Sequence, residues 1–312
     1  MTRLGDVLAV VDLDNHPEQT LDRAVWIARL LGRGLEILLC AHEGHTMLDG
    51  YAYSSESEVL RRGILDVQDK ILQGYSTRAE EAGLSVAASL LEQRPISDGV
   101  MARALESDPC VIVKSTRFHS AAERGILLDT DWQLIRSSPY PLWLVKSESM
   151  SEKPVVLAAV DPTHAHDKPA ALDRRIVEAA RLIAESAAGE FHLLHTYQRL
   201  SAIGSAANRA LTAAKLSIDE IDEQSRTHHA QALRRFAAEH AVGEDHTHQL
   251  PGRTHEILPV FARNKKADLV IMGALARWGL KRMAVGSAAE RVLDHLPCDV
   301  LVVRANEYRI GG

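Results

Sequence analysis

The sequence has few cysteines, no long apolar run and no targeting signal. Its three cysteines, Cys40, Cys110 and Cys298, lie far apart, which excludes a disulfide framework and a zinc ribbon. They are typical of small core residues in a reducing compartment. No apolar stretch approaches the length of a transmembrane helix, and the first residues lack the apolar run of a signal peptide. We therefore expect a soluble cytoplasmic protein that does not bind membranes.

An excess of charge and the common catalytic signatures are lacking as well. The net charge is −6, from 36 basic and 42 acidic residues. The chain as a whole is therefore not attracted electrostatically to nucleic acid, and we expect no nucleic-acid partner. The chain contains no G-x-S-x-G turn, no complete P-loop, no HExxH and no CxxC. These absences predict a protein that is not an enzyme, and they leave only a slow ATP hydrolysis open.

An internal repeat is the main feature that the chain does contain. The stretch "SSPYPLWLVK" at 137–146 lies 158 residues before "HLPCDVLVVR" at 295–304, aligned without a gap. With 312 residues and 46% hydrophobic composition, the chain has material for two cores. We predict two domains, 1–147 and 153–306, joined by the polar linker "KSESMSEKP" at 146–154.

Both halves repeat one order of elements. Each begins with an apolar run that ends in an aspartate, "DVLAVVD" or "PVVLAAVD", and reads as a buried strand. Helical periodicity is expected near residues 17–31, 96–106, 168–187, 215–240 and 254–264. Alternating strands and helices predict a doubly wound parallel sheet in each half. In a strand order of 3-2-1-4-5, the ligand crevice lies outside the carboxyl ends of strands one and four, here at Asp161 and Gly273.

Two stretches carry a family resemblance, "TDWQLIRSSPYPLWLVK" at 130–146 and "VIMGALARWGLKRMAVGSAAERVLDHLPCDVLVVR" at 270–304. With them, the whole chain resembles the tandem universal stress proteins. The resemblance implies two α/β domains of the adenine nucleotide alpha hydrolase-like type, packed as an internal pseudo-dimer. It also implies a role in the stress response and leaves protein partners and a further homodimer open.

ATP-binding members of this family carry Gly, two residues, Gly, nine residues and then Gly-Ser or Gly-Thr. This chain keeps the spacing with Gly273, Ala276 and Gly286-Ser287, but the middle glycine is replaced. A glycine after a strand lets the backbone approach a phosphate, and a helix N-terminus at Gly286 offers N–H donors to it. The resemblance therefore implies ATP, with Mg²⁺, or another small ligand in the second domain.

Three further positions are carried over from the resemblance. Asp161 matches the family aspartate near the adenosine, and Thr196 matches the residue whose backbone meets the adenine. Arg277 adds positive charge that can contact phosphates. Alanine at 276 costs about 1 kcal/mol if that position needs a positive φ.

The same residues allow a structural interpretation without nucleotide. Gly273 suits a plain turn, Ser287 and Glu290 form a capping box, and Arg277 suits a solvated surface. A scaffold that binds protein partners and no nucleotide is therefore the alternative function.

The first half keeps no glycine at the motif positions, which hold Ser115, Phe118 and Leu128. Asp129 and Asp131 stand at the expected helix start, where a carboxylate takes the place of a bound anion. We predict that this half does not bind ATP.

Histidine clusters are the remaining candidates for chemistry. They are His164 and His166 with Asp167, His228 with His229, and His246 with His248 at alternate residues of an expected strand. None has a cysteine or carboxylate at a diagnostic spacing, so the sequence predicts no metal site.

Overall fold

The computed structural model describes residues 5–40, 55–116, 130–146, 149–163, 170–199, 217–274, 292–293 and 295–305. The chain divides into two compact units. The N-terminal unit holds residues up to Met150, and the C-terminal unit is Ser151–Ala305. Within the described residues, no helix is both long enough and apolar enough to span a bilayer.

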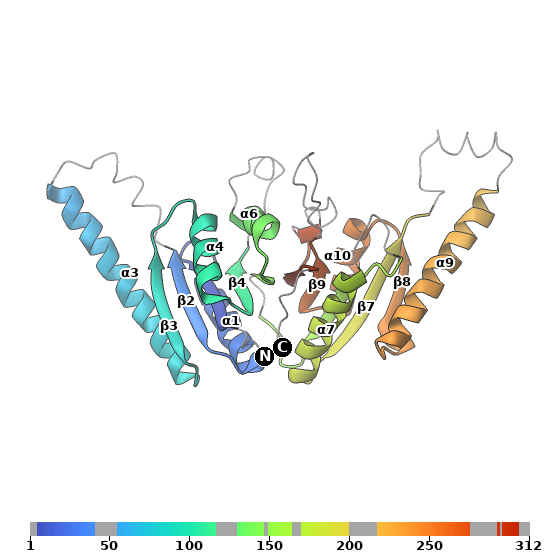
Figure 1. The fold of residues 1–312 in the computed structure, drawn as a ribbon, viewed down its shortest axis with the longest axis horizontal. Coiled ribbons are helices and arrows are strands. Elements are labelled where there is room, and N and C mark those ends of the chain that lie inside the picture. Colours follow the sequence, from blue (N-terminus) through green and yellow to red (C-terminus); the bar gives the residue numbers. More distant parts are fainter. Residues whose placement is uncertain are drawn as a thin grey trace. The chain divides into compact units, whose positions relative to one another are not determined.

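The N-terminal unit is a parallel five-stranded sheet with the order β3-β2-β1-β4-β5 (Figure 1). Its strands are β1 (Val7–Asp12), β2 (Leu35–Cys40), β3 (Val86–Leu91), β4 (Val111–Ser115) and β5 (Leu142–Val145). Its helices are α1 (Pro17–Leu31), α3 (Ser55–Glu81), α4 (Ile96–Ser107) and α6 (Thr130–Ser137). The predicted strand order is confirmed in this unit.

Helices cover both faces of this sheet. Arg78 of α3 forms ion pairs with Glu18 and Asp22 of α1, so these two helices lie side by side on one face. Helix α4 packs against α6, as expected for the return crossover on the other face. The apolar run of β1 is almost fully buried between these layers, which explains why it has no polar alternation.

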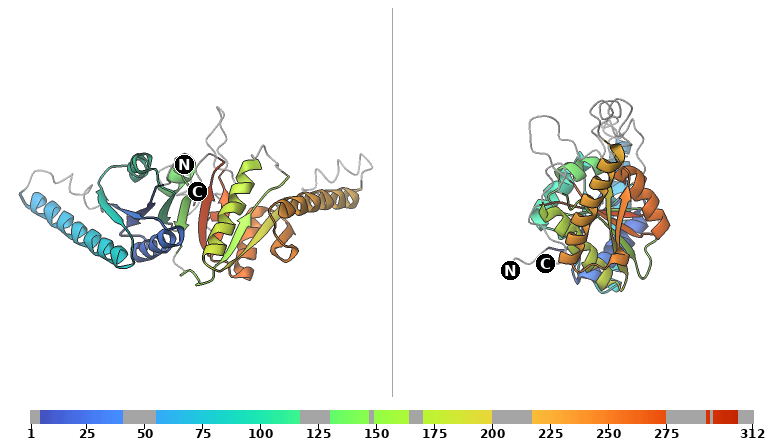
Figure 2. Two further views of the ribbon diagram at one scale, coloured as in Figure 1. Left: turned by 60° about the horizontal axis from the view of Figure 1, so that its bottom comes forward. Right: turned by 90° about the vertical axis from the view of Figure 1, so that its right-hand side faces the viewer.

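The C-terminal unit repeats this topology, with β8-β7-β6-β9-β10 in one parallel sheet. Its strands are β6 (Val155–Ala159), β7 (Glu190–Tyr197), β8 (Thr247–Pro251), β9 (Leu269–Gly273) and β10 (Asp299–Val303). Its helices are α7 (Ala170–Ser186), α9 (Ile218–Glu239), the 3-10 turn η3 (Glu244–His246) and α10 (Thr254–Lys265). A long helix runs beside the edge strand β3 or β8 in each unit, α3 beside β3 and α9 beside β8 (Figure 2).

Strand β7 shows which helices share a face of the sheet. Arg181 of α7 lies over the ring of Phe191, whereas Thr196 contacts Thr254 of α10. Residues of opposite parity on a strand face opposite sides, so α7 and α10 cover different faces. The Arg181 guanidinium also donates to the His240 carbonyl at the end of α9, which places α9 with α7.

Local signals explain the helix boundaries. Pro17 begins α1, and Gly32 follows it in the left-handed conformation with its N–H directed back to the last carbonyls. Ser217 accepts from the Glu220 N–H at 3.3 Å and caps α9, which has glutamate at the third position of its first turn. These signals are local in sequence, and the expected helices at 17–31, 96–106 and 254–264 end within one residue of the observed bounds.

Candidate functional site

The candidate site is the edge of the C-terminal sheet where the strand order reverses. Strands β6 and β9 are parallel neighbours, with Ala158 opposite Ile271, and the chain reaches β7 on the other side of β6. Their carboxyl ends therefore meet at one edge, which is the place where open α/β sheets bind ligands. Asp161 follows β6 and Gly273 ends β9, so both predicted residues reach this edge.

Asp161 is held in a fixed position by its neighbours. Its backbone N–H donates to Oδ1 of Asp173, a fully buried carboxylate on α7, at 3.1 Å. Its own Oδ1 accepts from the Thr163 hydroxyl at 2.6 Å. The side chain stays 30% exposed, so this carboxylate remains accessible to a ligand. The sequence did not indicate the role of Asp173, because the N–H that its carboxylate accepts belongs to Asp161, 12 residues earlier in the chain.

A buried histidine, His195, and a half-buried one, His229, lie beside Asp161. Nδ1 of His195, on β7, is 3.1 Å from the Val160 carbonyl, which only accepts, so Nδ1 carries the proton. Its Nε2 then accepts from Nδ1 of His229, on α9, at 2.8 Å. Burial lowers the pKa of both histidines, so both rings are neutral near pH 7. Nε2 of His229 is thereby left as an acceptor, with Tyr197 stacked on the same ring.

The other predicted residues differ in how the structure uses them. The Thr196 hydroxyl lies 2.6 Å from that of Thr254, which joins the end of β7 to the start of α10. At Gly273, an added Cβ would lie 2.5 Å from Leu172 Cδ2 and 2.8 Å from its Cγ. The glycine is therefore needed for close packing of α7, a reason that neither the turn nor the phosphate interpretation anticipated. Ala276, Arg277, Gly286 and Ser287 lie outside the described residues.

The N-terminal unit has a different arrangement at the corresponding edge. Nζ of Lys114, on β4, lies 2.7 Å from Oδ1 of Asp131 in the first turn of α6, and both side chains are buried. The same ammonium donates to the Ser115 carbonyl at 2.9 Å. Burial alone would lower the pKa of Lys114, but the charges of Asp131 and Asp12 together raise it. The Asp131 carboxylate is thus paired with the buried ammonium of Lys114 in the first turn of α6. This is the helix start at which the sequence predicts that a carboxylate takes the place of a bound anion.

Two further residues of this edge are also engaged locally. Asp12 Oδ1 accepts from the Asp14 N–H at 3.1 Å, which is the turn-capping role that an aspartate after a strand often takes. Cys40, at the end of β2, is buried, and burial raises the pKa of its thiol to about 11. All three cysteines are free and buried, as predicted from their spacing.

The histidine candidates are rearranged by the fold. The strand that the sequence predicts from His246 begins at Thr247 instead, because His246 ends η3. Only His248 therefore lies on β8. Both nevertheless contact His192 of β7, with ring centroids 4.7 and 5.1 Å away. His228 and His229 lie on α9 as predicted, while His164, His166 and Asp167 fall outside the described residues.

Comparisons with known proteins agree with this topology. The profile of the universal stress protein family matches residues 4–146 and 155–304. Universal stress protein E of Salmonella typhi is 24% identical over 310 residues, which cover 99% of this chain and 97% of that protein. A functionally unknown protein of Pseudomonas aeruginosa has a TM-score of 0.69 and 23% identity, covering 96% of this chain and 92% of its own. A universal stress protein of Archaeoglobus fulgidus reaches a TM-score of 0.66 at 15% identity, covering 96% of each chain.

The two family matches coincide with the two repeated sheets, each of which has the strand order expected from the sequence. The chain therefore belongs to the universal stress protein family, with two copies of its fold in tandem.

Proposed function

We infer that the C-terminal unit binds an adenine nucleotide at the carboxyl edge of β6 and β9, as a regulatory ligand of a cytoplasmic stress protein. The observation that carries this inference is Asp161, a partly exposed carboxylate fixed at the point of strand reversal. A carboxylate at this point of a doubly wound sheet is well placed to accept hydrogen bonds from ribose hydroxyls. Thr196, at the end of the next strand, is the proposed neighbour of the adenine.

The phosphates are assigned to the segment that follows Gly273. Gly286 and Ser287 are proposed to offer backbone N–H donors, and Arg277 a side-chain cation. Mg²⁺ is proposed to arrive with the triphosphate, since this ion is usually held by phosphate oxygens and water rather than by a protein cage. Ala276 then takes the place of the family glycine without closing the site.

Only the C-terminal unit is proposed to take part. In the N-terminal unit, the corresponding edge holds the buried pair of Lys114 and Asp131, so a phosphate there would have to displace a carboxylate from its cation. The domains 1–147 and 153–306 are thus proposed to differ in function, the first being structural or partner-binding and the second ligand-binding.

Calorimetric unfolding with and without Mg-ATP tests this function. At about 100 times its dissociation constant, a ligand adds about 2.7 kcal/mol to the unit that binds it. For a unit of this size, that gain raises the transition temperature by about 5–11 °C. Gly286→Asp should abolish the shift by placing a carboxylate among the phosphate donors. Gly74→Asp is the matched control, because Gly74 is exposed on α3 and a Cβ there meets nothing within 4 Å.

The outcomes separate the competing functions. A shift in the wild type and in Gly74→Asp that is absent in Gly286→Asp supports the nucleotide site. No shift in any of the three proteins would overturn it in favour of a scaffold that binds protein partners. Release of phosphate from ATP that disappears in Gly286→Asp would identify a slow ATPase instead of a pure binding protein.

A further inference from the structure

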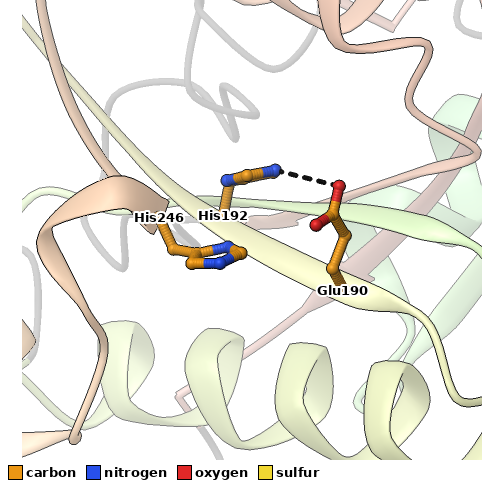
Figure 3. A group of neighbouring side chains, drawn as sticks. All are labelled: Glu190, His192 and His246. Carbon is orange, nitrogen blue, oxygen red and sulfur yellow. Dashed lines mark ion pairs between the residues drawn. The ribbon is translucent and has the colours of Figure 1, made fainter.

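A second group of polar side chains gathers at the opposite end of the C-terminal sheet. Glu190 and His192 lie two residues apart on β7 and therefore face the same side, where η3 brings His246 next to them (Figure 3). One candidate ligand atom from each of the three residues lies within 4.8 Å of the others. This cluster is at the amino end of β7, about 13 Å from Thr196 at the carboxyl end.

The hydrogen bonds of His246 fix which of its nitrogens is available. Its Nδ1 lies 3.1 Å from the Phe191 carbonyl oxygen. A carbonyl only accepts, so Nδ1 carries the proton and Nε2 keeps its lone pair. Histidines that bind metals usually donate their other N–H to a carbonyl or a carboxylate in this way, because that bond orients the ring.

His192 supplies a buried nitrogen with an unmet requirement. The residue is 4% exposed, and within the described residues its Nε2 has no hydrogen-bond partner, although Glu190 Oε1 lies 3.5 Å away. On the other side of the ring, Nδ1 lies 3.2 Å from Nε2 of His248. When Nδ1 donates to His248, the Nε2 lone pair of His192 is directed toward Glu190. In the opposite tautomer, His248 donates to Nδ1 and the proton on Nε2 of His192 points at Glu190. A bound cation would take the place of that proton between His192 and Glu190.

We propose that Glu190, His192 and His246 bind a divalent transition-metal ion, with Zn²⁺ as the best match. Two imidazole nitrogens and one carboxylate are a common zinc set, and they leave one position open for water or another ligand. Imidazole donors disfavour Mg²⁺ and Ca²⁺, which take oxygen ligands. His248 acts as a positioning residue through its hydrogen bond to His192.

Binding requires a local rearrangement of the three side chains. Zinc bonds of about 2.0–2.2 Å place ligand atoms of a tetrahedral site about 3.3–3.5 Å apart. The Glu190–His192 distance already has this value, and the candidate ligand atom of His246 lies within 4.8 Å of the other two. The His246 ring is stacked on that of His192 at an interplanar angle of 20°, so it must turn until its lone pair points at the ion. The Glu190 side chain is 54% exposed and His246 is half-buried, so both can change rotamer. Lys265, whose positive charge acts on His192 and His248, opposes binding, and the Glu190 carboxylate offsets it.

Zinc titration of the untagged full-length chain, stripped with a chelator, tests the proposal by calorimetry. The wild type should bind one equivalent of Zn²⁺. His246→Gln and Glu190→Gln should each weaken binding by about tenfold or more, since even a residue behind a ligand contributes about that much. His228→Gln, which removes an exposed histidine of α9, is the matched control and should bind as the wild type does. Circular dichroism of the zinc-free variants checks that they are folded.

Cobalt gives a readout that a merely structural effect would not produce. Co²⁺ in the wild type should show the visible absorption of a tetrahedral site, and His246→Gln should lose or shift it. The proposal is overturned if the wild type binds less than one equivalent of Zn²⁺, or if both cluster variants bind as tightly as the wild type. Loss of binding in His229→Gln with unchanged binding in His246→Gln would also overturn it, because the ion would then be at the other histidine pair.

Discussion

Replacing Lys114 probes a buried ion pair of the N-terminal unit. Its side chain is 7% exposed, that of Asp131 is 3% exposed, and Nζ lies 2.7 Å from Oδ1. At the repeat offset of 158 residues, the C-terminal half has Met272 and Ala289 at these positions. Lys114→Met and Asp131→Ala therefore give the first unit the residues that the second unit has at these two positions.

Removing one partner leaves the other charge buried, which costs about 3–5 kcal/mol. We expect Lys114→Met to lower the free energy of unfolding of this unit by that amount, or its transition temperature by about 6–20 °C. The double variant should recover most of the loss, because replacing a whole buried ion pair by apolar groups is often neutral or stabilising. The coupling between the two substitutions is thus expected to be large and favourable.

Tryptophan fluorescence during urea denaturation can follow this unit alone. Trp26, Trp132 and Trp143 all belong to it, and the fourth tryptophan can be removed in a Trp278→Phe background. Lys70→Met is the matched control, because this lysine is exposed on α3 and should change stability by no more than about 0.5 kcal/mol. A loss below about 1 kcal/mol for Lys114→Met, or strictly additive effects in the double variant, would refute the argument that the pair is a tightly coupled buried unit.

Three other predictions concern both units. Gly273→Ala should destabilise the C-terminal unit by about 1–3 kcal/mol without any nucleotide, because its methyl group collides with Leu172. Adding Leu172→Val should restore part of the stability measured by calorimetry, and no recovery would contradict this cause. The pKa of His195 is lowered in the folded protein, so the unfolded chain takes up a proton first as the pH falls below about 6.5, and the unit loses stability there. His195→Asn, which keeps a donor toward β6, should make the decline in urea midpoint between about pH 7 and about pH 5 shallower, and an unchanged slope would exclude His195 as its source. Arg78→Ala should cost no more than about 1 kcal/mol by the fluorescence assay, because its ion pairs are exposed; a larger loss would show that they hold α3 in place.

The topology was predictable because its signals are local and repeated. The first strand of each unit is a short apolar run, and Pro17 and Gly32 mark the two ends of α1 in the sequence itself. The strand order followed from the family resemblance and from the general behaviour of alternating strands and helices. Asp12 at the end of β1 and Asp161 two residues after β6 indicated the edge at which a ligand is expected.

The contacts at the two edges were not predictable in the same way. Lys114 has the ordinary position of a polar residue near a strand end, and its partner Asp131 becomes a partner only when α6 folds back over β4. His192 meets His246 through a turn 54 residues later, so no spacing rule could connect them. The reason for Gly273 is likewise a side chain of another helix. Each of these is a contact between residues that are distant in the chain, and a single sequence has no periodic pattern that predicts such a contact.

The two edges differ in a way that bears on which unit can respond to a nucleotide. A phosphate that bound beside Lys114 would have to separate it from Asp131 and leave that carboxylate buried, at a cost of about 3–5 kcal/mol. Such a cost weakens a dissociation constant by roughly two to four orders of magnitude. At the corresponding positions the C-terminal half has Met272 and Ala289, so it has neither this lysine nor the aspartate that neutralises it. A bound anion is then expected to find its positive charge in the following segment, at Arg277, Lys281 and Arg282. The two units thus share one fold, and the proposed difference in ligand binding rests on the ion pair of Lys114 and Asp131, which the N-terminal unit has and the C-terminal sequence lacks.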